Sequence, residues 1–137
     1  MTNRTHTTGS VRDSRSGKGR FDLISPVVDQ LLAKHMETGA VKYGDRNWES
    51  GQPLSWYIDS AKRHEANVRE GLTDEDHAVA ALWNWHAFIH TREMIRRGVL
   101  PKELDDMPRY GGVDNVRQQT QASPSRPDGV PQVQGAW

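Results

Sequence analysis

The sequence predicts an all-α fold, a small helical bundle within one domain, and three observations support it. Apolar residues recur at spacings of three and four in three stretches of the chain. Serine, threonine or proline precedes these stretches and glycine follows each of them. The third stretch is apolar around almost its whole circumference, which is typical of a helix buried on several sides. In a chain of 137 residues, such a helix indicates a bundle that packs against a second subunit.

The composition excludes several classes of protein. Hydrophobic residues make up 34% and charged residues 26%, so a compact part must coexist with solvated tails or share its core with another subunit. The formal net charge is +0, which gives no case for nucleic acid or a membrane as a partner. The absence of cysteine excludes disulfides, zinc–thiolate sites and thiol catalysis. No apolar run reaches the length of a membrane span, so we expect a cytoplasmic protein.

The two ends of the chain differ in character from its middle. Residues 1–18 are rich in Thr, Ser, Gly and Arg, which predicts a disordered basic arm. This arm is expected to be a solvated tail, with contact to nucleic acid as the alternative. Residues 113–137 are rich in Gln, Ser, Pro and Gly and predict a flexible tail. Residues 19–112 would then form the folded domain.

The first helix is predicted to begin at Pro26 and to end at Gly39. Ser25 is a typical N-cap, and proline suits the first helical position. Glu37 falls in the last turn, where the helix dipole disfavours an anion. A carboxylate there invites a cation, either a side chain or a metal ion, and an ordinary exposed glutamate is the alternative.

Residues 39–54 form a glycine-rich segment that is too long for a simple connection. Lys42 and Arg46 offer cations for phosphate groups. Asn47 can pair with the edge of a base, and Tyr43 or Trp48 can stack on its ring. This combination suits a nucleotide. An Ω-loop held together by its own aromatic residues explains the same composition equally well.

The second helix, about 56–70 with Ser55 as its N-cap, has few aliphatic residues on its inner face. This face carries His64 and Glu65 towards the interior, where burial of polar groups is unfavourable unless they have a purpose. His64 could instead bond a neighbouring backbone group. Gly71 suits the left-handed position that ends a helix.

The third helix is predicted over residues 74–97, with Thr73 as N-cap and Asp76 completing a capping box. His77 and Asn84 lie in one line along it, with the small Ala81 between them. The small residue leaves room for a ligand or for close approach of another helix. Residues 100–110 are expected to form a short helical turn and an extended exit.

Carboxylates and imidazoles gather at the turn between the second and third helices, which points to a divalent metal. Oxygen ligands from Glu65, Asp76 and Glu37 would suit Mg²⁺ or Mn²⁺ bridging substrate phosphates. His64 and His77 could ligate Mn²⁺ or act as acid and base towards a water molecule. Phosphoryl transfer needs a metal ion, cations on the phosphates and an oriented water.

Five segments together resemble the phage dATP/dGTP diphosphohydrolase family, which includes the MazZ enzymes. They are GRFDLIS (19–25), GAVKYGDRNWESG (39–51), SAKRH (60–64), DEDHAVAALWN (74–84) and PKELDDMPRY (101–110). This family is related to the MazG-like all-α nucleoside triphosphate pyrophosphohydrolases. The resemblance spans about residues 18–112 and implies cleavage between the α and β phosphates of a purine deoxynucleotide. In phages that replace adenine by 2-aminoadenine, MazZ supplies dGMP and depletes dATP.

The chain departs from the MazG-like pattern at the metal site. Those enzymes bind Mg²⁺ through Glu-x-x-Glu on one helix and Glu-x-x-Asp on the next. The second helix here has no Glu-x-x-Glu. His64 and Glu65 stand where the first acidic pair is expected, and Asp76 and His77 where the second begins. The metal ligands are therefore carried over by helix rather than residue by residue.

We therefore predict an oligomeric MazG-like bundle, a homodimer or homotetramer, that hydrolyses dGTP or dATP with Mg²⁺ or Mn²⁺ in the cytoplasm, the host's if the chain is phage-encoded. The predicted metal ligands are Glu65, Asp76, His77 and Glu37, and the predicted catalytic residues are His64, His77 and Glu65. The predicted substrate-binding residues are Lys42, Tyr43, Arg46, Asn47, Trp48, Arg63 and Asn84. The alternatives are a small phage DNA-binding or regulatory helical protein, and a MazG-like fold that binds nucleotides without hydrolysis.

Overall fold

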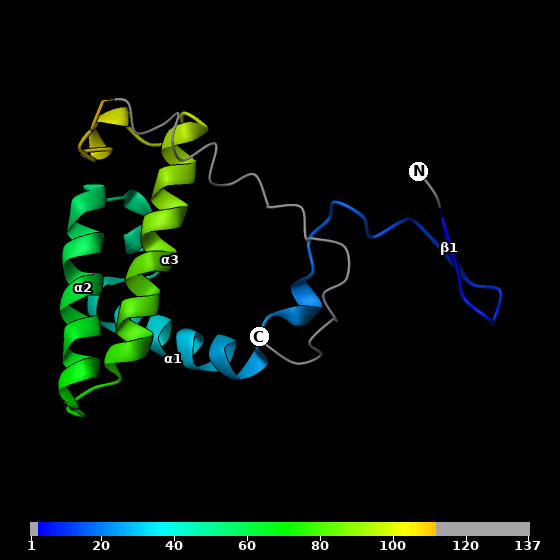
Figure 1. The fold of residues 1–137 in the computed structure, drawn as a ribbon, viewed down its shortest axis with the longest axis horizontal. Helices are drawn as coiled ribbons and strands as arrows, with labels where there is room; N and C mark the ends of the chain where they lie inside the picture. The colour runs from blue at the N-terminus through cyan, green and yellow to red at the C-terminus, as the bar shows by residue number, and fades with distance from the viewer. Residues whose placement is uncertain (1–2, 112–137) are drawn as a thin grey trace, which may run out of the picture. The chain divides into compact units, whose positions relative to one another are not determined.

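The computed structural model describes residues 3–111, and helices dominate it (Figure 1). Its elements all lie in the unit formed by residues 1–106. In order they are β1 (Arg4–Thr5), β2 (Val11–Arg12), the 3₁₀ turn η1 (Phe21–Leu23), α1 (Pro26–Tyr43), the 3₁₀ turn η2 (Asn47–Ser50), α2 (Leu54–Glu70), α3 (His77–Arg96) and the 3₁₀ turn η3 (Lys102–Leu104). The predicted all-α class is confirmed for this part of the chain.

Helices α2 and α3 form an antiparallel hairpin and lie side by side along their length (Figure 1). Leu54, Tyr57 and Ala61 of α2 are buried. They meet a buried face of α3 in which Ala80, Ala87 and Thr91 are small. Small side chains allow the two helix axes to approach closely, so the hairpin forms a tight core. Helix α1 contacts α3 on another side.

Helix α1 is longer than the sequence predicted. It continues through Gly39 and ends at Gly44, whose φ is 92°. A glycine ends a helix when its backbone turns to positive φ, and Gly44 does so whereas Gly39 keeps the helical conformation. The predicted helix end at Gly39 was therefore wrong. The segment between α1 and α2 shortens to residues 44–53, with η2 at its centre.

Helix α3 begins three residues later than predicted. Asp76 is its N-cap, and its Oδ1 atom accepts a hydrogen bond from the Val79 amide at 3.1 Å. The prediction of Thr73 as N-cap was wrong. The predicted end of α2 at Gly71 is confirmed, since this residue is left-handed with φ 81°. Asp74 and Glu75 consequently lie in the turn between the helices, where their carboxylates can reach back to the hairpin.

Helix α2 begins at Leu54, with Pro53 in the N-cap position. The prediction of Ser55 as N-cap was therefore wrong, because Ser55 already lies within the first helical turn. Proline cannot offer a side-chain acceptor to the free amides of that turn. Ser55 instead bonds the carboxylate of Asp106.

The predicted N-terminal arm contains a short hairpin. Strands β1 and β2 pair antiparallel, with Arg4 opposite Arg12, and their residues are exposed. The predicted tail, residues 113–137, lies outside the described residues. Over residues 3–111, no helix is long and apolar enough to cross a membrane.

Much apolar surface is left uncovered by this chain. No residue of α1 is buried. Helix α3 also exposes Leu82, Trp85 and Ile89, which follow one another at helical spacing. The exposed apolar residues of η1 and the first turns of α1 are Phe21, Leu23, Ile24, Val27, Val28 and Leu31. Exposed apolar surface of this extent is unusual for a monomeric soluble protein.

Candidate functional site

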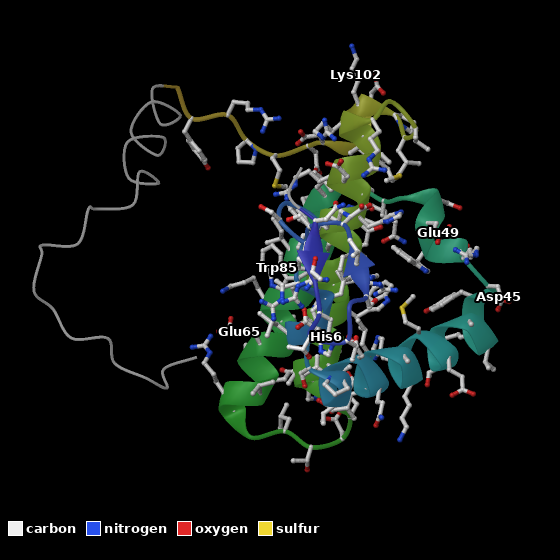
Figure 2. The ribbon with its side chains drawn as sticks, turned by 90° about the vertical axis from the view of Figure 1, so that its right-hand side faces the viewer. His6, Asp45, Glu49, Glu65, Trp85 and Lys102 are labelled. Atoms are coloured by element: carbon white, nitrogen blue, oxygen red, sulfur yellow. The ribbon has the colours of Figure 1, made fainter. Side chains whose placement is uncertain are left out.

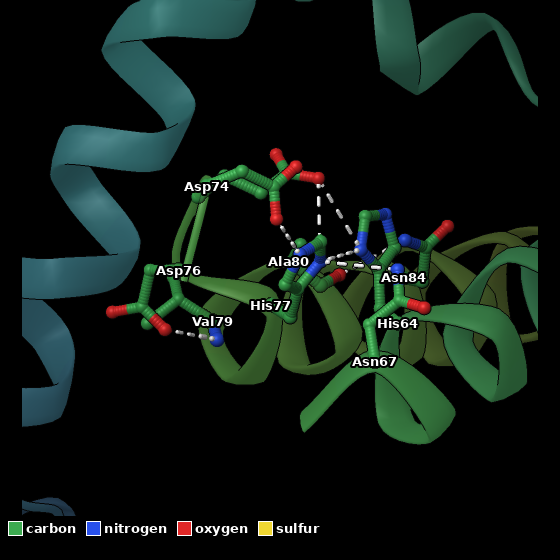
Figure 3. A network of polar contacts seen from close by, with 9 residues as sticks. His64, Asn67, Asp74, Asp76, His77, Val79, Ala80 and Asn84 are labelled. Atoms are coloured by element: carbon green, nitrogen blue, oxygen red, sulfur yellow. Dashed lines mark hydrogen bonds and ion pairs between the residues drawn. The ribbon is translucent and has the colours of Figure 1, made fainter. Parts of the chain in front are cut away.

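Two imidazoles face each other near the turn that joins α2 to α3 (Figure 3). His64 lies in the second half of α2, and His77 is the first residue of α3. Their Nδ1 atoms are 3.0 Å apart, and their ring centroids are 5.3 Å apart. The His77 side chain is only 3% exposed, whereas that of His64 is 23% exposed. The structure thus brings together the two histidines that the sequence singled out.

The carboxylate that joins them is Glu75, from the turn before α3. Its Oε1 atom lies 3.6 Å from Nδ1 of His64 and 3.4 Å from Nδ1 of His77. The sequence analysis did not select Glu75, which it placed in the first turn of the third helix. A helix start at His77, signalled by the capping side chain of Asp76, would have put Glu75 in the turn beside the imidazole. We call His64, Glu75 and His77 the triad.

Asp74 contacts His77 on the side of the ring that faces away from His64 and Glu75. The Nε2–H group of His77 donates to Oδ1 of Asp74 at 2.7 Å. This hydrogen bond is the main reason why the pKa of Asp74 lies below its ordinary value. Because the ionised carboxylate holds the proton on Nε2, a neutral His77 carries a lone pair on Nδ1, which faces Glu75 and His64. Asn67 lies beside the same atom, with its Nδ2 atom at 3.5 Å.

The carboxylates predicted as metal ligands lie elsewhere. Glu65 pairs with Nζ of Lys62 at 3.0 Å and with Nε of Arg69 at 3.3 Å. The hydrogen bond from Lys62 is the first cause of its lowered pKa. Asp76 is turned away from the imidazoles towards the Val79 amide (Figure 3). Neither residue joins the triad, because each is held by a partner on its own helix.

A cavity of about 830 Å³ lies between α1, the segment around η2, and α2 and α3. Its volume falls in the range typical of small-molecule sites. Figure 2 shows Asp45 and Glu49 on the segment that leaves the C-terminal end of α1, and both line the cavity. Of the predicted site residues, those in its wall are Glu37, Tyr43, Arg46, Asn47, Trp48 and Asn84.

The cavity wall is rich in aromatic rings. Trp48 packs against the rings of His86 and His90, with centroid distances of 5.2 and 4.7 Å. Trp83 donates from Nε1 to Sδ of Met36 at 2.9 Å, which ties α3 to α1 across the cavity. The sequence analysis did not select the lining residues His35, Trp56, Tyr57 and Trp83.

The polar residues of the cavity wall differ in how many of their hydrogen-bonding groups already have a partner. Nη1 of Arg46 pairs with Oε1 of Glu49 at 2.6 Å, and Arg46 has a left-handed backbone with φ 58°. Asn84 is buried and donates from Nδ2 to the Ala80 carbonyl at 2.9 Å. The Oδ1 atom of Asn84 is an acceptor that this bond leaves unused.

Two predicted phosphate-binding cations lie outside the cavity wall. Arg63 pairs with Asp59 one turn earlier on α2, with Nη2 and Oδ2 2.5 Å apart. Lys42 lies over the ring of Tyr43, with Nζ 5.0 Å from the ring centroid. Both side chains are exposed. Among the predicted cations, the structure therefore brings only Arg46 to the cavity.

His35 is a cavity residue within electrostatic reach of the triad. It lines the cavity and stacks near Trp83, with ring centroids 5.8 Å apart. Burial is the first cause of its lowered pKa, and the charge of Glu75 acts in the opposite direction. The charge of His64 lowers it further. On α2, His64 of the triad lies one helical turn from Ser60, which lines the cavity.

The donor atoms of the triad fit a divalent cation. Two imidazole nitrogens and one carboxylate oxygen lie within 4.8 Å of one another. Imidazole suits zinc, iron and nickel ions better than Mg²⁺, which prefers oxygen ligands. The triad thus fits a metal ion but differs from the oxygen set that the sequence suggested for Mg²⁺.

Comparison with known families identifies the chain. The sequence model of the N-terminal part of the dATP/dGTP diphosphohydrolases matches residues 8–99. The chain belongs to the dATP/dGTP diphosphohydrolase family. No curated protein and no solved structure matches the chain. The matched range contains the triad and every residue of the cavity wall, so the candidate site lies wholly within the part that this chain shares with the family.

The predicted family resemblance is therefore confirmed, and four of its five segments lie within the matched range, whereas residues 101–110 lie outside it. The family name indicates a hydrolase that acts on dATP or dGTP in deoxynucleotide metabolism.

Proposed function

We propose that this protein hydrolyses dGTP and dATP to the deoxynucleoside monophosphate and pyrophosphate. The observation that carries the proposal is a nucleotide-sized, aromatic-lined cavity with His64 of the triad one helical turn along α2 from Ser60 of its wall. In this reaction a water oxygen bonds to the α phosphorus while the bond from that phosphorus to the αβ-bridging oxygen breaks. The electron pair leaves with pyrophosphate, and the water proton passes to a nearby base.

The purine is bound in the cavity by stacking and by edge contacts. Trp48 and Tyr43 offer ring faces to the base, since aromatic side chains can stack on any nucleobase. Asn84 and Asn47 offer amide groups to the purine edge. Trp48 is held in place by the rings of His86 and His90, so its own rotamer is restricted before the base arrives.

The triphosphate is oriented by Arg46. Its guanidinium is the one predicted cation in the cavity wall, and its partner Glu49 is in the same wall. A guanidinium binds phosphate through two parallel hydrogen bonds, so it can exchange Glu49 for the substrate. Glu37 is a second carboxylate of the wall, and it is a candidate ligand for the Mg²⁺ or Mn²⁺ that accompanies a triphosphate.

The triad would hold a divalent cation through Nδ1 of His64, Oε1 of Glu75 and Nδ1 of His77. When bound, such an ion supplies positive charge against the phosphate oxygens. Asp74 keeps the proton of His77 on Nε2, so that Nδ1 stays available as a ligand. His35, an imidazole of the cavity wall whose pKa is lowered by burial, would accept the proton of the attacking water.

The functional unit is proposed to be a homodimer or homotetramer. The exposed apolar residues of α1 and α3 would be covered by the corresponding surfaces of another copy. Light scattering on the purified protein tests this, and a monomer at micromolar concentration would contradict it. In a phage that uses 2-aminoadenine, the product dGMP would supply that pathway.

The reaction itself is tested with purified protein, dGTP or dATP and Mg²⁺ or Mn²⁺. We expect equal amounts of pyrophosphate and deoxynucleoside monophosphate, resolved by ³¹P NMR. Release of orthophosphate would contradict the proposed bond cleavage. Nucleotide binding without turnover by any purine deoxynucleotide would favour a binding protein instead.

A further inference from the structure

We infer that His64, Glu75 and His77 form a site that selects a borderline transition ion, of the zinc and cobalt class, over Mg²⁺, with Asp74 as the residue that positions His77. This deepens the proposed function, because it names the class of ion at the proposed triad. It rests on the geometry of the free protein and needs no bound nucleotide.

The spacing of the three donors matches a single ion. The separations are 3.0 Å between the two Nδ1 atoms, and 3.4 and 3.6 Å from these atoms to Oε1 of Glu75. Two ligands at about 2.1 Å from one zinc ion lie about 3.0 to 3.5 Å apart, depending on the angle between them. The donors are thus already close to the positions that one ion requires.

The protonation pattern leaves electron-rich atoms facing one another. Asp74 fixes the proton of His77 on Nε2, so Nδ1 of His77 presents a lone pair. That lone pair meets Nδ1 of His64 and a carboxylate oxygen of Glu75. One proton on His64 can satisfy one of these contacts, whereas a cation between the three donors satisfies all of them.

Asp74 acts on His77 and not on the ion. A histidine ligand commonly donates its second ring N–H to a carboxylate, which fixes the tautomer and makes the free nitrogen more basic. The bond from Nε2 of His77 to Asp74 at 2.7 Å has this arrangement. Because the His77 side chain is 3% exposed, the ring is also held rigidly by packing.

The donor types decide which ion is preferred. Two nitrogens and one oxygen form a set found at zinc sites with two histidines and a glutamate. Mg²⁺ prefers oxygen ligands and loses its bound water reluctantly, so two imidazole ligands add little to its binding affinity. Glu75 is 52% exposed, which leaves the site open to an ion arriving from the turn between α2 and α3.

The binding experiment uses untagged, metal-free protein titrated with Co²⁺, followed by its visible absorption and by calorimetry. We expect one Co²⁺ per chain, displaced by Zn²⁺ at equal concentration and retained in millimolar Mg²⁺. Glu75→Gln and His77→Ala should remove the absorption of bound Co²⁺. Asp74→Asn, which keeps all three ligands, should weaken Co²⁺ binding 10- to 100-fold.

Two variants serve as matched controls. His90→Gln removes a histidine of α3 that packs against Trp48 and lies outside the triad. Glu65→Gln removes a carboxylate of α2 that is paired with Lys62 and Arg69. Both should bind Co²⁺ as the wild type does. Glu75→Gln changes a half-exposed side chain, so it tests the site even if His77→Ala does not fold.

Three results would overturn the inference: no Co²⁺ absorption in the wild type, displacement of Co²⁺ by Mg²⁺ at equal concentration, or unchanged binding in both Glu75→Gln and His77→Ala. Metal binding is measured without substrate, so its failure is distinct from a failure to hydrolyse dGTP. A protein that binds Co²⁺ at the triad but turns over no deoxynucleotide would retain this inference and lose the proposed function.

Discussion

Asp106 caps the first turn of α2 from a point 51 residues further along the chain. Its Oδ1 atom accepts a hydrogen bond from the Ser55 amide at 2.9 Å, and its Oδ2 atom accepts one from the Ser55 hydroxyl. Helix α2 has proline in its N-cap position, so its own sequence supplies no capping side chain. The carboxylate of Asp106 takes the place of this missing capping side chain, and the positive end of the helix dipole stabilises its negative charge.

Asp106→Ala is therefore expected to lower the Tm by a few degrees, because the first turn of α2 loses its acceptor. Thermal unfolding followed by circular dichroism measures the effect. Glu103→Ala is the matched control, since it removes another exposed carboxylate of the same segment. An equal Tm for the two variants would show that Asp106 does not cap the helix.

Gly51 is predicted to tolerate alanine less well than Gly44. Both have positive φ, 83° and 92°, which strains any other residue by about 1 kcal/mol. A Cβ at Gly51 would also lie 2.9 Å from Cδ1 of Leu104 and 3.0 Å from Cδ1 of Leu100, whereas Gly44 has open space. The leucines can rotate, so the clash adds about 1 kcal/mol.

Urea denaturation of Gly51→Ala and Gly44→Ala measures this difference as a shift in midpoint. The wild-type protein is the reference for both. Equal destabilisation of the two variants would mean that the leucines of the segment after α3 do not pack on Gly51.

His86 is expected to make the folded protein less stable at mildly acidic pH. Its pKa is lowered, first by burial and then by the charge of His90, and Trp48 covers its ring. The unfolded chain, with a pKa near 6.5, then binds more protons than the folded protein. Stability contributed by neutral His86 is therefore present above about pH 6.5 and declines as the pH falls towards the folded pKa.

The loss is limited by solvent screening, since His86 is exposed. Unfolding free energies at pH 7 and pH 5 measure it for the wild type and for His86→Gln. The variant should lose less stability on acidification, although His35, whose pKa is also lowered, still contributes in the same direction. An identical pH dependence would remove His86 from this account.

Arg46 and Arg63 should differ in their effect on substrate. Arg46 lines the cavity, whereas Arg63 is paired with Asp59 on the exposed side of α2. Loss of a guanidinium–phosphate contact, about 1.5 to 3 kcal/mol, raises the KM for dGTP by about tenfold or more in Arg46→Ala. Arg63→Ala should change the KM less than twofold. The reverse order in steady-state kinetics would favour the placement that the sequence alone suggested.

The sequence predicted the hairpin of α2 and α3 and the meeting of His64 and His77, because the turn at Gly71 is signalled locally. It could not predict which carboxylate joins them. Glu65, Glu75 and Asp76 are all within reach of the turn, and the choice depends on the residue at which α3 begins. The length of α1 was also hidden, because Gly39 and Gly44 look alike in the sequence and differ only in backbone conformation.

The cavity wall was predictable where its residues lie close together in the sequence. Tyr43, Arg46, Asn47 and Trp48 lie together in sequence, so their common surface followed from one segment. His35 and Trp83 reach the cavity through the packing of α1 on α3, which no local pattern reveals.

The central claim is that Glu75, and not Glu65, is the carboxylate of the catalytic site. It is tested by the initial rate of pyrophosphate release from dGTP in two matched variants, both confirmed to be folded. We expect Glu75→Gln to lose at least about 100-fold in rate, since a ligand of the charged site is removed. Glu65→Gln should retain most of the wild-type rate. A fully active Glu75→Gln protein, or an inactive Glu65→Gln protein, would contradict the account.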